Sequence, residues 1–191
     1  MKEILLTFIL IVNQPNCLTV PEAKKAQAIA VAKLNTLSPY KFKSRLIRMR
    51  DPFPDTNKGI ERLVAWNNYF LANKSRATYI HVFDVARDER LAGIAFLCQP
   101  VKRTNQVSIT MQRFAEVGKY KTTITGIAAA HEIGHQLGFQ HVGIFGGDSS
   151  WVSIMDEALF QYRFVRHVRR FFFVDKPDAL EEFGCKENFR R

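Results

Sequence analysis

The sequence predicts a mixed α/β (α+β) fold in which strands and helices alternate along a single domain. Short apolar segments alternate with longer segments whose apolar residues recur at helical spacing. The chain has 191 residues, 47% hydrophobic and 24% charged, which suits one compact core and excludes a disordered or low-complexity chain. Three widely spaced cysteines form neither a disulfide framework nor a CxxC metal knuckle, so the fold does not depend on oxidation.

The first element is the apolar run at residues 4–12, which is too short to cross a membrane. We interpret it as a buried strand. The alternative is the core of a signal peptide, because Lys2 precedes it. Glu3 weakens that alternative, and no A-x-A cleavage site follows the run.

The later elements follow from the spacing of apolar residues and from Gly, Pro and capping signals. They are a helix at 21–34, a strand at 42–49, a helix at 59–72, strands at 79–85, 93–98 and 107–111, a helix from 122 or 123 to 137, and a late helix at 159–172. The sequence shows no internal repeat, linker or second domain.

Three of the five histidines fall in one string, HEIGHQLGFQH, which begins at His131. On a helix, His131 and His135 lie one turn apart on the same face, so both can bind one ion at the ~2.0–2.1 Å that zinc requires. Gly138 can adopt a left-handed conformation without strain, which lets the chain turn His141 back toward the metal. Three neutral nitrogens leave the fourth tetrahedral position open, which is typical of a catalytic zinc site.

Glu132 is the candidate catalytic residue. Its carboxylate can take a proton from water activated by the zinc and later deliver that proton to a leaving amine. The five fixed positions of the string would match by chance with a probability on the order of one in a hundred thousand. Core histidines clustered without a metal would carry a steep desolvation cost, so we favour metal binding over a structural cluster.

The string HExxHxxGxxH, followed by the sequence SIMD that contains Met155, resembles the metzincin clan of zinc endopeptidases and its Met-turn. The resemblance implies a twisted mixed sheet of about five strands, an active-site helix and a C-terminal helix after the Met-turn. It also implies that Met155 supports the metal site as a hydrophobic floor. The spacing is closest to the adamalysin or reprolysin branch, and Val142, where adamalysins usually carry Asp, leaves the branch open.

The same resemblance assigns a role to the strand predicted at 93–98. In metzincins an edge strand binds an extended substrate through backbone hydrogen bonds. The residues to which the resemblance carries this role are Gly93, Ile94, Ala95 and Phe96.

We therefore expect a zinc-dependent endopeptidase with one catalytic Zn²⁺ ion and a protein or peptide substrate in extended form. Two alternatives stay open: a zinc hydrolase that acts on a non-protein amide, and a basic binding module in which zinc is structural.

The formal net charge of +10 favours acidic partners. Basic residues concentrate at 41–50 and 163–170, and the second cluster suits the C-terminal end of a helix, so we do not expect nucleic-acid binding. We expect a monomer without a transmembrane segment. The resemblance favours a location outside the producing cell, although the sequence offers no convincing signal peptide.

Overall fold

The computed structural model describes residues 2–12, 14, 18–36, 40–53, 56, 58–73, 77, 79–85, 92–96, 106–111, 121–139, 141, 152–155 and 171–172. The elements in chain order are β1 (Lys2–Val12), α1 (Val20–Leu34), β2 (Tyr40–Arg50), α2 (Gly59–Ala72), β3 (Tyr79–Asp84), β4 (Gly93–Ala95), β5 (Gln106–Met111), α3 (Lys121–Gln136), β6 (Val152–Ser153) and β7 (Phe171–Phe172). This order confirms the mixed α/β class.

Five strands form one twisted sheet in the order β2-β1-β3-β5-β4. β1 pairs in parallel with β2 along its whole length and with β3 on its other side, and β3 pairs in parallel with β5. β4 is antiparallel to β5 and forms one edge. Residues 4–12 therefore lie in the interior of the sheet, as the strand interpretation predicts.

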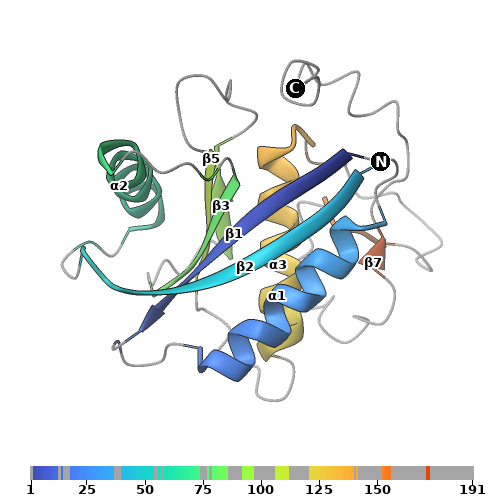
Figure 1. Cartoon of the computed structure of the whole chain (residues 1–191), viewed down its shortest axis with the longest axis horizontal. Helices are drawn as coiled ribbons and strands as arrows, with labels where there is room; N and C mark the ends of the chain where they lie inside the picture. The colour runs from blue at the N-terminus through green and yellow to red at the C-terminus, as the bar shows by residue number, and fades with distance from the viewer. Residues whose placement is uncertain are drawn as a thin grey trace.

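Helices cover both faces of the sheet, with α1 and α3 on one side and α2 on the other (Figure 1). Alternation along β1 explains the two layers, because successive side chains of a strand point to opposite faces. Phe8 and Leu10 join the core cluster that contains residues of α1 and α3, whereas Ile9 and Ile11 join the cluster that contains Trp66 of α2.

The helix α3 is held deep in the molecule. Nearly all of its residues are buried, and the Gln136 side-chain amide donates a hydrogen bond of 2.9 Å to the Ile80 carbonyl of β3. On its other side α3 packs closely on α1, because a Cβ at Gly126 would lie only 2.7 Å from the Ala26 carbonyl oxygen. These contacts fix α3 beside α1 on one face of the sheet.

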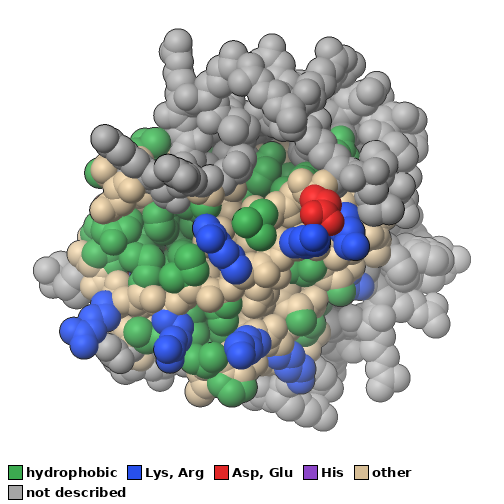
Figure 2. All heavy atoms as spheres, viewed as in Figure 1, with side chains coloured by type: hydrophobic (Ala, Val, Ile, Leu, Met, Phe, Trp, Pro, Cys, Tyr) green, Lys and Arg blue, Asp and Glu red, His purple; other side chains and the backbone are tan. Residues whose placement is uncertain are grey.

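The basic segment at 41–50 forms the second edge strand, β2. Figure 2 shows lysine and arginine side chains spread over the described part of this face, with little acidic surface between them. Charged side chains on an edge strand oppose pairing with the strands of other chains, and this effect explains why basic residues are concentrated on β2. The exposed basic residues of β2 are Lys41, Lys43, Arg45, Arg48 and Arg50. The second basic cluster, at 163–170, lies outside the described residues.

The prediction of a helix at 159–172 is wrong at its C-terminal end. Phe171 and Phe172 form β7, which pairs in parallel with β6. An aromatic pair has high strand propensity, and the pairing with β6 decides its conformation over helical periodicity. Residues 159–170 lie outside the described part of the chain. Among the described residues, no helix has the length and apolar character needed to cross a membrane.

Candidate metal centre

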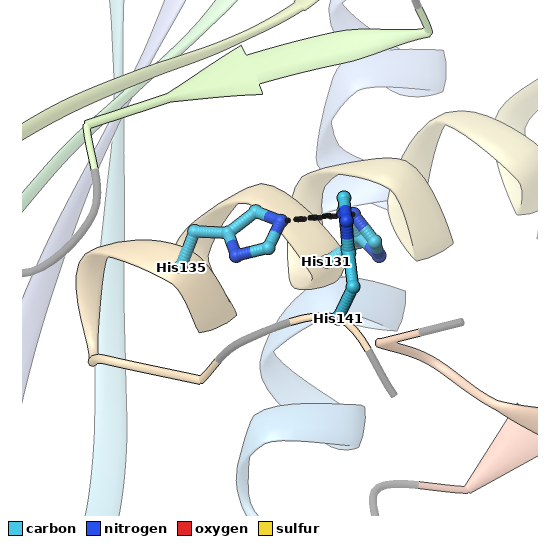
Figure 3. Close-up of side chains that lie close together, drawn as sticks. All are labelled: His131, His135 and His141. Carbon is cyan, nitrogen blue, oxygen red and sulfur yellow. Dashed lines mark hydrogen bonds between the residues drawn. The ribbon is translucent and has the colours of Figure 1, made fainter. Parts of the chain in front are cut away.

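Three histidine rings converge at the end of α3. His131 and His135 project from adjacent turns of the helix, and His141 approaches from the segment that follows it (Figure 3). The Nε2 atom of His131 lies 3.2 Å from that of His135 and 3.2 Å from that of His141, and the third pair, His135 and His141, is separated by 3.1 Å. The structure thus brings together the three histidines that the sequence motif singles out.

Two backbone carbonyls determine which nitrogen of the helical histidines carries the proton. His131 Nδ1 lies 2.5 Å from the Ile154 carbonyl oxygen, and His135 Nδ1 lies 2.7 Å from that of Phe139. Since a carbonyl only accepts, each Nδ1 donates its proton there and leaves the Nε2 lone pair unprotonated. Such carbonyl partners are typical of metal-ligating histidines.

Burial keeps these rings neutral. It lowers the pKa of His131 to about 3, with a smaller lowering from the neighbouring histidines, and it also lowers the pKa of His135. Neutral imidazole is the form that binds a metal ion.

The donor set fits a zinc ion. Nitrogen ligands at ~2.05 Å in tetrahedral geometry are separated by about 3.3 Å, close to the observed 3.1–3.2 Å. Three converging lone pairs repel one another in the absence of a cation. Among the described residues, this is the group of His, Cys, Asp or Glu side chains that could hold a metal ion.

The turn that brings His141 into the site is built on Gly138. The helix ends at Gln136, and Gly138 has φ 100°, a conformation that costs a residue with a Cβ about 1–2 kcal/mol. Gly138 N–H donates to the His135 carbonyl and Phe139 N–H to the Gly134 carbonyl, both at 3.0 Å. This is the Schellman pattern of a helix C-terminus, as the sequence predicts for Gly138.

Glu132 lies on the same turn as His131 and is 4% exposed. Burial raises the pKa of Glu132 to about 8. Its side chain lies against the edge strand, because a Cβ built on Gly93 would be 2.6 Å from Glu132 Cγ and 2.7 Å from Oε1. The site therefore places a buried carboxyl between α3 and β4.

Met155 is 2% exposed and belongs to the core cluster that includes Ile133 and Leu137 of α3. Its neighbour Ile154 supplies the carbonyl that accepts from His131. Ile154 and Met155 of the SIMD segment thus lie beside the histidine cluster.

The predicted edge strand at 93–98 is shorter in the structure. β4 contains Gly93, Ile94 and Ala95, Phe96 follows it, and residues 97 and 98 lie outside the described part of the chain. Ile94 and Phe96 pack against the core cluster on the α2 side of the sheet. β4 lies at the edge of the sheet, the position that the metzincin resemblance implies for this strand, and it is antiparallel to β5.

Sequence reasoning missed the two carbonyls of Ile154 and Phe139 and the contact of Gly93 with Glu132. Every residue has a backbone carbonyl, so residue type does not reveal which carbonyl accepts a hydrogen bond from a histidine. The only available signal was the position of Phe139 directly after the glycine that ends the helix. The glycine at the start of a short apolar strand was the available signal for the second feature, because an isolated strand glycine often marks a close approach.

Comparison with known proteins agrees with this geometry. Residues 29–142 match the family described as metallo-peptidase family M12B, reprolysin-like. The matched segment includes all three histidines and Glu132. No curated protein matches the chain.

Two solved structures share the fold. Archaemetzincin from Methanopyrus kandleri superimposes with a TM-score of 0.58 at 12% identity, over 100% of this chain and 96% of that one. Metalloproteinase-II from Bacteroides fragilis gives a TM-score of 0.55 at 15% identity, over 74% of this chain and 44% of that one. This chain therefore spans less than half the length of the Bacteroides fragilis protein.

The metzincin-like fold and the histidine cluster agree with the family match, which is to a metallopeptidase family. The family match covers more than half of the 191 residues. The chain belongs to the reprolysin-like metallopeptidases of family M12B.

Proposed function

We propose that this chain is an endopeptidase in which His131, His135 and His141 hold one Zn²⁺ ion and Glu132 serves as general base and then general acid. The observation that carries the proposal is the convergence of three Nε2 atoms within 3.2 Å of one another. The next residue after His131 is a buried carboxyl. Such a pairing of ligand and base on one helical turn is typical of zinc peptidases.

In this mechanism the protein supplies the proton transfers. Zinc, when bound, supplies Lewis-acid polarisation of the scissile carbonyl and makes water more acidic. Glu132 accepts a proton from the attacking water and then delivers it to the nitrogen of the leaving amine. The reaction needs no covalent intermediate between the substrate and a side chain of the protein.

The edge strand β4 suits an extended peptide. It is three residues long, antiparallel to β5 and at the edge of the described sheet. A substrate that adds to such an edge is held by main-chain hydrogen bonds, independently of most of its side chains. The acidic character of the substrate, the monomeric state and a location outside the producing cell stay predictions.

The test is cleavage of an unfolded protein and a mixed peptide library by the zinc-loaded wild type and by Glu132→Ala. We expect Glu132→Ala to lower kcat by about 10²–10⁴-fold, the usual contribution of a general base, while it retains zinc. Glu61→Ala is the matched control, because Glu61 is an exposed glutamate on α2 that is paired with Lys58. It should leave both cleavage and zinc content unchanged.

The three possible outcomes of this cleavage experiment lead to different conclusions. Cleavage by wild type and not by Glu132→Ala, with zinc in both, supports the proposal. Equal cleavage by both proteins removes Glu132 from the mechanism. Zinc in both without cleavage by either contradicts the endopeptidase and favours a hydrolase of non-protein amides or a binding module.

A further inference from the structure

The side chain of Glu132 and the backbone of β4 approach more closely than any side chain on residue 93 would permit. A Cβ at Gly93 would lie 2.6 Å from Glu132 Cγ, 2.7 Å from Oε1 and 2.8 Å from Cδ. Carbon atoms in ordinary contact stay about 3.5–4.0 Å apart. The strand therefore rests directly on the glutamate, with hydrogen as the only substituent between them.

Neither partner of this contact can yield easily. Glu132 is 4% exposed, so protein atoms surround nearly all of its side chain. β4 is held in register on β5, with Gly93 opposite Thr110, and the Met111 N–H donates a 2.9 Å hydrogen bond to the Ala92 carbonyl. Ile94 packs against the core cluster on the opposite side of the sheet.

We propose that Gly93 is a positioning residue for Glu132. Because Gly93 has no side chain, β4 can pack directly against Glu132 and fix the position of its carboxylate. This one contact therefore determines the position of the base relative to the strand on which an extended substrate would lie. The inference rests on the proposed function, because it assigns to Gly93 the alignment of the base with the bond to be cut.

A Cβ on residue 93 is expected to displace the Glu132 carboxylate while leaving the ligands in place. In the zinc-loaded enzyme, Gly93→Ala should lower kcat by up to about 100-fold, the cost of a 1 Å misplacement of a reacting group. The KM for a peptide and the zinc content should stay as in wild type, because backbone pairing on β4 and the three histidines are unchanged.

The matched control is Gly126→Ala. A Cβ at Gly126 also meets close neighbours, the Ala26 carbonyl oxygen at 2.7 Å and Ile29 Cβ at 2.8 Å, but these belong to α1. This variant should lower the unfolding temperature without a selective loss of kcat in the folded enzyme. The comparison separates general loss of packing from displacement of Glu132.

A second measurement uses unfolding rather than activity. Glu132→Ala removes all three atoms that a Cβ at residue 93 would meet. Gly93→Ala should therefore lower the unfolding temperature in the Glu132 background by several degrees and much less in the Glu132→Ala background. This non-additivity is the signature of a direct contact, and measuring it does not require the Gly93→Ala variant to be active.

The outcomes distinguish the inference from the proposed function. Loss of kcat in Gly93→Ala with unchanged KM, together with non-additive unfolding, supports the positioning role. Unchanged kcat, a rise in KM alone, or additive unfolding overturns it. If Glu132→Ala itself leaves cleavage intact, the proposed function has failed, whatever Gly93→Ala does.

Discussion

At the scale of single residues, His81 shows how the sheet holds a titratable ring that has no part in the metal centre. Its Nδ1 lies 2.7 Å from Ser108 Oγ and its Nε2 lies 3.0 Å from Thr110 Oγ1, both on the neighbouring strand β5. The ring is 1% exposed, and burial lowers the pKa of His81 to about 3. A neutral imidazole can donate to one hydroxyl and accept from the other.

The depressed pKa of His81 makes stability depend on pH. Between about pH 6.5 and pH 3 the unfolded chain binds a proton at this residue and the folded chain does not, so the free energy of unfolding falls as the pH falls. We expect His81 to contribute a slope of about 1.4 kcal/mol per pH unit in this window. Urea unfolding of zinc-loaded wild type and of His81→Gln at several pH values measures it. Parallel curves for the two proteins would show that His81 does not titrate on unfolding.

Some contacts of single residues could be predicted from the sequence, and others could not. The proximity of His131 and His135 could be predicted from the sequence because a helix places residues i and i+4 together by local geometry alone. His81 lies outside the group that could hold a metal ion, which contains His131, His135 and His141 among the described residues. Its hydroxyl partners on β5 were not readable, because they depend on the pairing of two strands far apart in the chain.

At the scale of elements, the C-terminus of α3 decides whether the third histidine reaches the other two. Gly138, with φ 100°, lets the chain reverse within three residues of His141. Gly138→Ala should cost about 1–2 kcal/mol of strain, and part of this cost is relieved if the turn opens and moves His141 away. We expect zinc affinity to fall by up to about 5–30-fold, the equivalent of this strain, measured by competition with a chelator.

The companion variant for this prediction is Gly138→Asn. Asparagine tolerates the left-handed region better than alanine, so this protein should retain most of the zinc affinity. Equal affinity in Gly138→Ala and wild type would show that the turn does not control His141.

Element boundaries were predictable where local signals were strong. The helix α2 spans Gly59–Ala72 as expected from its apolar spacing, and β1, β2, β3 and β5 differ from expectation by one or two residues at their ends. The prediction failed at β4, where the apolar sequence continues beyond Ala95 but the pairing with β5 ends there. It failed again at Phe171 and Phe172, because the pairing with β6 is a nonlocal contact.

At the scale of the whole molecule, a buried ionic network secures the face of the sheet opposite the metal centre. Arg62 of α2 pairs with Asp84 at the end of β3 and with Asp51 after β2, the latter at 3.0 Å. The Arg62 guanidinium also donates to the carbonyls of Phe53 and Thr56, and Trp66 donates to Asp84. The Arg62 side chain thereby joins α2 to the end of β3 and to the connection that follows β2.

Removal of Arg62 should therefore destabilise the molecule as a unit. All three ionic side chains are at most 2% exposed, so Arg62→Ala leaves two buried carboxylates without their cation. We expect a loss of about 3–5 kcal/mol in the free energy of unfolding, a large part of the roughly 5–15 kcal/mol typical of a domain. Lys58→Ala breaks the exposed Lys58–Glu61 pair of the same helix and should cost less than about 1 kcal/mol. Urea unfolding measures both, and a similar small loss in the two variants would mean that the network adds nothing beyond a surface pair.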